Sequence, residues 1–262
     1  MAEKRVAMDR RKFLYKSATF FAGSLFGLNF FSKALGANNP INQPRIALII
    51  DDIGFSRSLL RKFLEIQVPM TFAILPRLEK SHDLAKEIHV QGHEIMLHQP
   101  MEPFDPHIDP GPGAVYVGDD ANKIVRTIGE NISDTPFVTG INNHMGSRFT
   151  SRQKEMKEAL KAIKKRGLFF VDSLTTSRST AFKTARRLHM ATACRNLFLD
   201  NYPEESAILS QLCKLKELAI RSGHAIGIGH PYPETAKAID SFQKGLKGPG
   251  VSMVHISRLI PA

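Results

Sequence analysis

The sequence has no tryptophan, two cysteines and fewer acids than bases, with 25 Asp and Glu against 36 Lys and Arg in 262 residues. The two cysteines, Cys194 and Cys213, match no zinc-binding spacing, and we expect them to be buried free thiols. The chain also contains no recognisable nucleic-acid-binding motif. The net charge of +11 therefore does not indicate a nucleic-acid partner.

Much of the positive charge lies at the amino terminus. The first 36 residues carry seven Lys and Arg against two acids, so the remainder of the chain keeps a net charge of +6, spread along its length. A surplus of this size is a weak indication of an anionic polymer of the cell envelope as the partner.

The amino-terminal segment has the order of an export signal. Paired arginines, Arg10 and Arg11, precede an uncharged, Phe-rich run from Ser17 to Ser32, and small residues follow up to Ala37. Arginines in this place resemble a twin-arginine signal. The run of 16 residues is shorter than the roughly 20 that a membrane span needs. We expect a signal peptide at residues 1–37, rather than a retained anchor, and export by the twin-arginine machinery to the periplasm or cell envelope.

After a short polar linker at residues 38–44, apolar strand-like stretches alternate with amphipathic helical stretches to residue 262, with no break in composition. This alternation requires parallel strands joined by right-handed crossovers. The number of repeats predicts one α/β domain, a (β/α)7–8 barrel with a distorted shape. An open doubly wound sheet is the alternative that the pattern leaves open.

The expected elements follow from apolar periodicity and from Gly and Pro punctuation. Strands are expected at 45–50, 71–75, 94–98, 137–141, 168–172, 189–193, 224–229 and 251–256. Helices are expected at 56–67, 81–91, 119–131, 151–166, 178–188, 204–222 and 234–246. Residues 99–118 hold five prolines and three glycines, which predicts a long loop.

Acidic and imidazole side chains end the expected strands or directly follow them. They are Asp51, Asp52, His98, His144, Asp172 and His230. The carboxyl ends of parallel strands meet on the active-site face of a barrel, so residues about 180 apart can share one pocket. An isolated Asp-Asp pair is more often a helix cap beside a solvated acid, and a lone histidine is more often structural. Together these side chains predict a divalent metal site with an open position.

Five sequence blocks resemble the divergent polysaccharide deacetylase family, a branch of the polysaccharide deacetylase superfamily, over residues 45–260. The blocks are IDDIG at 50–54, GHEIMLHQPMEP at 92–103, NNHMGS at 142–147, FVDS at 170–173 and GHP at 229–231. The resemblance implies a distorted barrel of the polysaccharide deacetylase type. It further implies that Asp51 is the catalytic base, that Asp52 and His98 bind the metal, and that His230 is the late acid.

One position departs from the pattern of the wider superfamily. Four residues after His98, where a second histidine is expected, this chain has Glu102. Either Glu102 binds the metal, or His144 fills the vacant position. Zinc accepts Asp, Glu and His ligands alike, so the sequence leaves both open, with Zn²⁺ the expected metal.

The expected activity is metal-dependent hydrolysis of an N-acetyl or O-acetyl group on an envelope or extracellular glycan. Asp172 is expected to orient His230 or Arg148, because a carboxylate behind an imidazole fixes its tautomer. Phe104 and Tyr116, in the proline-rich loop, are expected to bind the substrate together with Arg148. Two alternatives remain: a non-catalytic carbohydrate or peptidoglycan-binding module on the same fold, and a metal-dependent amidase or esterase acting on a non-sugar substrate.

Overall fold

The computed structural model describes residues 43–246 and 250–260, so the expected signal peptide and residues 38–42 of the expected linker lie outside the described residues. The strands are β1 (Arg45–Ile53), β2 (Thr71–Ile74), β3 (Glu94–Met101), β4 (Val138–Met145), β5 (Phe169–Asp172), β6 (Thr192–Cys194), β7 (Leu197–Phe198), β8 (His224–Gly229) and β9 (Ser252–Met253). The helices are α2 (Arg57–Leu64), α3 (Ser81–Val90), α4 (Ala121–Asp134), α5 (Gln153–Lys164), α6 (Ala181–Arg187), α7 (Glu205–Ser222), α8 (Pro233–Gly245) and the 3₁₀ turn η1 (Ile256–Arg258).

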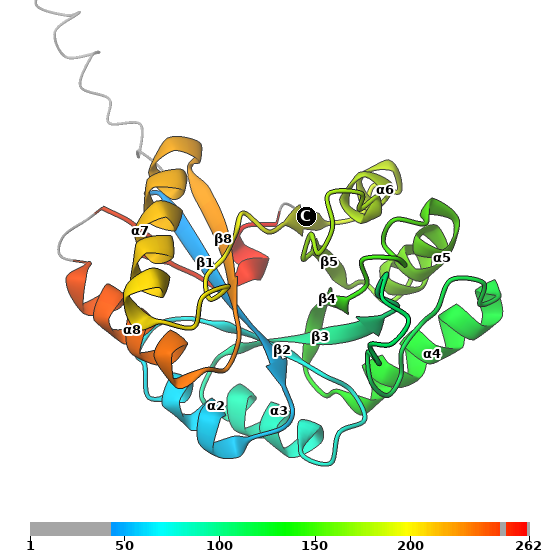
Figure 1. Cartoon of the computed structure of the whole chain (residues 1–262), viewed down its shortest axis with the longest axis horizontal. Helices are drawn as coiled ribbons and strands as arrows, with labels where there is room; N and C mark the ends of the chain where they lie inside the picture. Colours follow the sequence, from blue (N-terminus) through cyan, green and yellow to red (C-terminus); the bar gives the residue numbers. More distant parts are fainter. Residues whose placement is uncertain (1–42, 247–249, 261–262) are drawn as a thin grey trace, which may run out of the picture. The chain divides into compact units, whose positions relative to one another are not determined.

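All the paired strands are parallel, and their order is that of a curled barrel sheet. The order is β6-β5-β4-β3-β2-β1-β8-β7, with β9 beside the start of β1. Figure 1 shows β1 beside β8, with α7 and α8 on one side of the curl and α4, α5 and α6 on the other. A doubly wound sheet would reverse its strand order at a switch point. In this sheet the strands follow the order of the chain from β1 to β6 without such a reversal, and β8 and β7 continue on the other side of β1. The predicted barrel is confirmed, and the open sheet is wrong.

One extended segment, residues 192–198, links the two edges of the curled sheet. Its first half pairs with β5 and its second half pairs with β8. Between the two halves, the N–H of Arg195 donates to the carbonyl of Asp172 at 3.0 Å, and the N–H of Asn196 donates to the carbonyl of Ile226 at 2.9 Å. We predict one strand at residues 189–193, and the structure has two short strands, because the segment changes partner halfway.

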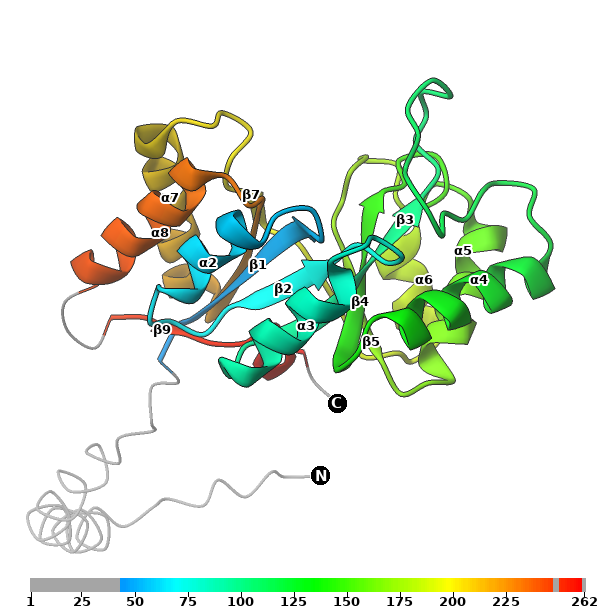
Figure 2. The same ribbon diagram turned by 90° about the horizontal axis from the view of Figure 1, so that it is seen from below.

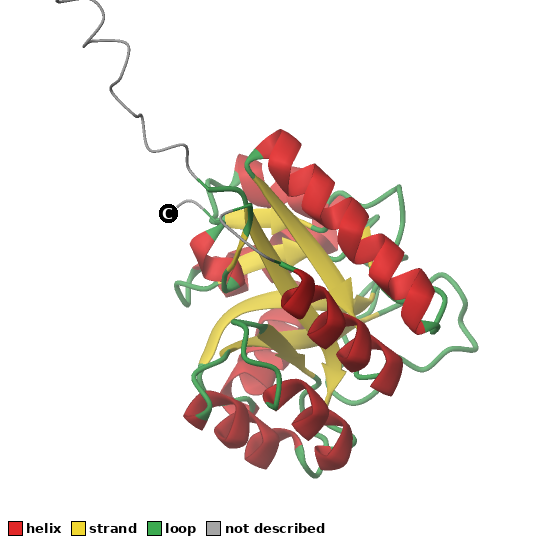
Figure 3. Cartoon of the chain, turned by 90° about the vertical axis from the view of Figure 1, so that its left-hand side faces the viewer, coloured by secondary structure: helices red, strands yellow, loops and turns green. Residues whose placement is uncertain are grey.

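Successive side chains of each strand point alternately into the curl and out toward the helices, as the strand period of two requires. The inward side chains form an apolar cluster that includes Ala47, Ile49, Ala73, Met96, Phe169, Val171, Ile226 and Ile228. The outward side chains, such as those of Leu48, Ile50, Leu97 and Phe170, pack under the helices in two further clusters. Figure 3 shows the strands inside and the helices outside.

The carboxy-terminal segment covers the amino-terminal end of the strands. Ile256 and Leu259 join the inward cluster. The N–H of Ile256 donates to Oγ1 of Thr71 at 3.1 Å, and the N–H of Ser257 donates to the buried carboxylate of Glu94 at 3.2 Å. The barrel is thus filled at this end, and its carboxyl end is left for the site.

The strands β3 and β4 extend further than the pattern predicts. β3 reaches Met101 and β4 reaches Met145, so His98, expected as the last residue of its strand, and His144, expected after its strand, both lie inside strands. The loop that follows β3 projects beyond the strand ends (Figure 2). Of the helices in the described ranges, not one combines the length and apolar character needed to cross a membrane.

Candidate active site

The inward rows of five strands carry polar side chains to the carboxyl end of the barrel. In four of them a polar residue follows the last apolar member two positions on: Ile49 is followed by Asp51, Met96 by His98, Val171 by Ser173 and Ile228 by His230. In β4 the inward row is Gly140, Asn142 and His144. Together with β2, these strands form the continuous stretch of curled sheet from β5 to β8, and their rows end at one cavity. A cavity of about 190 Å³ there is lined by Asp51, Asp52, His98, Asn143, His144, Met145, Ser173, Thr175, Phe198 and His230.

Strict alternation would send Asp52 outward, and an irregularity in β1 brings it into the cavity. Between Ile50 and Ile53, β1 has one residue more than its partner β2. Asp52 has a φ of +57°, a left-handed backbone conformation that non-glycine residues adopt at a cost. Bulges of this kind re-aim side chains next to active sites. The two adjacent aspartates therefore face the same cavity.

Three ligand atoms from three strands meet in this cavity. Oδ1 of Asp52 lies 3.1 Å from Nε2 of His98 and 2.9 Å from Nδ1 of His144. The two imidazole nitrogens are 3.1 Å apart. Three donor atoms bonded to one zinc ion at about 2.0–2.2 Å lie roughly 3.0–3.5 Å from one another. The triangle therefore has the size of a shared coordination sphere.

The protonation pattern around this triangle also fits a cation. Nδ2 of Asn142 donates to Oδ1 of Asp51 at 2.7 Å, so the Asn142 Oδ1, 2.7 Å from Nδ1 of His98, accepts the proton of that nitrogen. In the neutral ring this leaves a lone pair on Nε2, facing Oδ1 of Asp52. That buried oxygen has no hydrogen-bond partner among the described residues. Lone pairs turned toward one another at about 3 Å fit a metal ion between them.

Asn142 connects the expected base to an expected metal ligand through one amide. It is fully buried, and it fixes both the carboxylate of Asp51 and the ring of His98. Such partners behind a ligating histidine set its tautomer and orientation. Sequence reasoning gave Asn142 no role, although its inward position between Gly140 and His144 could have indicated one.

The two aspartates differ in their surroundings. Asp51 is 2% exposed, and this burial raises its pKa despite the nearby imidazoles and the hydrogen bond from Asn142. Burial also acts to raise the pKa of Asp52, but the imidazoles of His144 and His98, when they carry the protons that face Asp52, outweigh that effect and lower it well below the ordinary value. Asp52 is thus held as a carboxylate, as a metal ligand must be, while Asp51 has the raised basicity of a general base.

His230 is oriented by a carboxylate that sequence reasoning missed. Its Nδ1 lies 2.9 Å from Oδ1 of Asp200, and its backbone N–H donates to Oδ2 of the same residue. Asp200 is 6% exposed and also accepts from Oγ1 of Thr235 at 2.9 Å. It lies two residues after the inward-facing Phe198, at the end of β7. Because β7 was not predicted, no strand end marked Asp200.

We expect the Asp200–His230 pair to set the alkaline limit of any reaction in which His230 acts as a general acid. Burial lowers the pKa of His230, but the hydrogen bond and charge of Asp200 outweigh it and raise that pKa to about 9. In Asp200→Asn the pKa should fall toward about 6.5. A general acid must be protonated, so kcat/KM should be about 30-fold lower than wild type at pH 8 and nearly equal at pH 6. The pH profile of kcat/KM measures this shift.

Thr235→Val is the control for this experiment, because it removes one donor to Asp200 and keeps the charge. Its alkaline limb should stay close to the wild-type position. An alkaline limb that does not move in Asp200→Asn would show that His230 is not the titrating acid.

The expectation that Asp172 orients His230 or Arg148 is wrong, because the Asp172 carboxylate contacts other groups. Asp172 belongs to the outward row of β5, in step with Phe170. Its carboxylate accepts from the N–H of Leu174 at 2.9 Å, from Oγ of Ser179 at 2.7 Å and from the N–H of Phe182 at 3.1 Å. Asp172 therefore holds the loop between β5 and α6.

Glu102 and His144, the two expected candidates for the third ligand, lie in different surroundings. His144 takes part in the triangle, and the three residues Asp52, His98 and His144 form a possible metal site. The Glu102 carboxylate instead accepts from Nη1 of Arg148 at 2.8 Å and from the N–H of Val117 at 2.7 Å. Glu102 and Arg148 thus fasten the proline-rich loop to the end of β4.

Two apolar cavities flank the triangle, one on each side of Asp52. The first, of about 220 Å³, includes Phe55, Leu75, Pro76, Leu78 and Met145, and the second, of about 210 Å³, includes Phe55, Leu59, Pro231 and Tyr232. Phe55 is 64% exposed and borders both. The expected binders Phe104 and Tyr116 are exposed on the loop after β3, where Arg178 lies over the Phe104 ring. Phe55 and Tyr232 are thus the aromatic side chains that border these cavities, and residues 109–112 of the proline-rich loop border the first of them.

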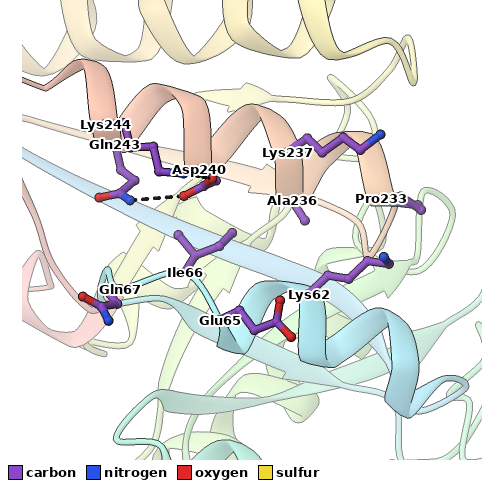
Figure 4. Close-up of a pocket in the computed structure, with 10 residues that line it drawn as sticks. All are labelled: Lys62, Glu65, Ile66, Gln67, Pro233, Ala236, Lys237, Asp240, Gln243 and Lys244. Atoms are coloured by element: carbon purple, nitrogen blue, oxygen red, sulfur yellow. Dashed lines mark hydrogen bonds and ion pairs between the residues drawn. The ribbon is translucent and has the colours of Figure 1, made fainter.

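A pocket larger than the cavities at Asp52 lies away from the barrel mouth, on the outer surface. It is a groove of about 590 Å³ between α2 and α8. Figure 4 shows Lys62 of α2 and Glu65, the residue after α2, facing Lys237 and Asp240 of α8 across it. Its charged, open lining contains none of the inward-row residues, so we place the chemistry at the smaller cavities around Asp52.

Both cysteines are free thiols in the described part of the chain, as expected. Cys194 in β6 is partly buried, and this burial raises its pKa to about 11. Cys213 is exposed on α7, so the expectation of burial is wrong for this residue. Neither thiol lines the cavities at Asp52.

The chain is similar in sequence and in fold to two proteins described as uncharacterized. The uncharacterized protein YibQ of Escherichia coli K12 is 29% identical over 231 residues, which cover 88% of this chain and 72% of YibQ. The crystal structure of an uncharacterized protein from Agrobacterium tumefaciens C58 is 27% identical, covers 83% of this chain and 89% of that chain, and gives a TM-score of 0.79.

More distant structures share the fold. A peptidoglycan N-acetylglucosamine deacetylase catalytic domain from Eubacterium rectale has a TM-score of 0.52 at 13% identity, covering 81% of this chain and 88% of that one. A CE4 family pseudoenzyme from Bacillus anthracis has a TM-score of 0.50 at 18% identity, covering 83% and 66%. The family model described as divergent polysaccharide deacetylase matches residues 48–260. On this match, the chain belongs to the divergent polysaccharide deacetylase family.

Proposed function

We propose that this protein is a metal-dependent hydrolase that removes acetyl groups from a carbohydrate of the cell envelope. The observation that carries the proposal is the triangle of Asp52, His98 and His144, with a buried carboxylate and a carboxylate-backed imidazole beside it. A non-catalytic binding groove needs neither a set of metal ligands nor an acid and base with shifted pKa values. The arrangement therefore favours the enzyme over a binding module.

The side chains divide the reaction between them. A divalent cation held by Asp52, His98 and His144 would supply polarisation of the acetyl carbonyl and a lowered pKa for attacking water. Asp51 takes the proton of that water, since burial raises the basicity of its carboxylate. His230 gives a proton to the leaving amine or alkoxide, and Asp200 holds its ring for that transfer. Zn²⁺ is the metal we propose, because the set combines one carboxylate with two imidazoles.

The cavities on both sides of Asp52 support a chain-like substrate. Phe55 and Tyr232 offer apolar ring surface next to the reacting groups, and sugar rings present apolar faces that pack on such surfaces. An acetylated glycan lying across the mouth would place one residue over the triangle and its neighbours in the flanking cavities. The deacetylase named among the structural neighbours acts on peptidoglycan, which is in keeping with an envelope glycan.

We further propose that the protein reaches the periplasm or cell envelope through residues 1–37. The twin-arginine-like segment lies outside the described residues, so this proposal rests on the order of basic, apolar and small residues alone.

Metal analysis and a substrate screen test the proposed function together. The purified protein should contain about one divalent metal ion per chain, and chelation should abolish acetate release from acetylated glycan oligomers. Acetylated peptides serve as the comparison, and preferential hydrolysis of these would favour an amidase of another class. A metal-free protein that binds glycan and releases no acetate would establish the binding module instead.

A further inference from the structure

Among the inward-row side chains of the site, Ser173 stands out because its hydroxyl has no hydrogen-bond partner among the described residues. It follows Phe169 and Val171 on the inward row of β5, and it is 1% exposed. It lines the cavity of about 190 Å³ together with Asp51 and His230. Its Oγ has no hydrogen-bond partner among the described residues. Burying a hydroxyl without a partner costs free energy, so packing alone does not explain a serine here.

The backbone of Ser173, by contrast, is held on both sides. Its N–H donates to Oδ1 of Asn143 at 3.0 Å, and its carbonyl accepts from Nε of Arg195 at 2.7 Å. The next residue, Leu174, has a φ of +47°, and its N–H donates to the carboxylate of Asp172. The turn that presents the hydroxyl is therefore fixed by three side chains, as a preorganised binding group requires.

Apart from His230, whose proposed role is to protonate the leaving group, the other groups of the cavity do not duplicate this hydroxyl. The carboxylates of Asp51 and Asp52 accept hydrogen bonds and do not donate them. Oγ1 of Thr175 donates to the carbonyl of Met145 at 2.8 Å, and Nδ2 of Asn143 donates to the same carbonyl at 2.8 Å. Ser173 thus places a buried hydroxyl, without a partner among the described residues, at the β5 side of the cavity.

We propose that the Ser173 hydroxyl donates a hydrogen bond to the carbonyl oxygen of the substrate's acetyl group. This inference rests on the proposed function and adds a substrate-contacting residue to it. Negative charge develops on that oxygen when water attacks, and a fixed donor aimed at it stabilises the transition state more than the bound substrate. The bound ester or amide oxygen also accepts this hydrogen bond, so substrate affinity depends on it to a smaller degree.

Ser173→Ala tests the proposal, because it removes the donor and breaks no hydrogen bond of Oγ with a described residue. We expect kcat on an acetylated glucosamine oligomer to fall about 10²-fold, with KM rising only several-fold. The melting temperature should not fall, since an unpartnered hydroxyl is removed. Thr184→Val is the matched control: Thr184 is 3% exposed on α6, and its Oγ1 also lacks a partner among the described residues. This variant should keep wild-type kinetics.

Calorimetric titration with the same oligomer accompanies the kinetics and separates the possible outcomes. If wild type binds and hydrolyses the oligomer and Ser173→Ala does both equally well, the Ser173 inference is overturned and the proposed function stands. If wild type binds without turnover and Ser173→Ala binds several-fold more weakly, the hydroxyl contact is supported and the hydrolase fails. If wild type does not bind the oligomer, both proposals fail.

Discussion

Asp51→Asn should reduce deacetylation by about 10²–10⁴-fold, the range that one general base contributes. The substitution keeps an oxygen that can accept from Nδ2 of Asn142, so the arrangement of the amide should persist. Asp51 is not part of the triangle of possible metal ligands, and metal content should be unchanged. Steady-state kinetics on an acetylated oligomer, with elemental analysis of the same sample, measures both quantities.

The stability of this variant should move in the opposite direction to its activity. A carboxyl group whose pKa is raised on folding opposes folding as the pH rises from its unfolded value, about 3.9, through its folded value. At neutral pH the charged Asp51 therefore costs stability, and Asp51→Asn should melt at the wild-type temperature or above it.

Glu94→Gln is the matched control for Asp51→Asn. Glu94 is also a buried acid, but it lies at the amino-terminal end of β3, where it accepts from Oγ1 of Thr71 at 2.9 Å. Its variant should hydrolyse the oligomer at the wild-type rate. Turnover by Asp51→Asn within a factor of two of wild type would remove Asp51 from the role of base.

His144→Ala should release the metal, while Glu102→Gln should retain it. Nδ1 of His144 lies at one corner of the triangle, 2.9 Å from Oδ1 of Asp52, whereas the Glu102 carboxylate is occupied by Arg148 and Val117. Removing one of three protein ligands should weaken metal binding by more than about 100-fold, since loss of an outer partner alone costs 10–100-fold. Competition with a chromophoric chelator measures the affinity of each variant.

Glu102→Gln should show its effect elsewhere, in the attachment of the proline-rich loop. We expect faster proteolysis within residues 103–116, because the ion pair of Glu102 with Arg148 ties this loop to the end of β4. Metal loss in Glu102→Gln together with full retention in His144→Ala would reverse our assignment of the third ligand.

Much of the site could be read from the sequence once strand periodicity was combined with barrel geometry. Asp51, His98 and His230 all continue the inward rows of their strands. A correct prediction of the strands therefore also predicts that these side chains meet at the carboxyl end of the barrel. The same rule separates Ser173 from Asp172: Val171 faces inward and Phe170 faces outward. Counting by two from Val171 would have pointed to the serine and away from the acid.

Other features had no signal of this kind. The bulge that turns Asp52 into the cavity is a local backbone conformation, and IDDIG gives no sign of which aspartate breaks the alternation. Asp200 was not identified because the strand before it, β7, is only two residues long. This strand forms where the segment 192–198 changes its partner from β5 to β8. A pattern needs several residues to be recognised, and this strand is set by tertiary pairing.

The segment that links β5 to β8 ties two halves of the site together mechanically. Near its middle, Arg195 donates a hydrogen bond to the carbonyl of Ser173. Just past its end, the carboxylate of Asp200 contacts the ring of His230. A displacement of these few residues would shift the Ser173 hydroxyl and the His230 ring at the same time. Cross-linking this stretch to its neighbours should consequently leave the metal ligands undisturbed while altering turnover.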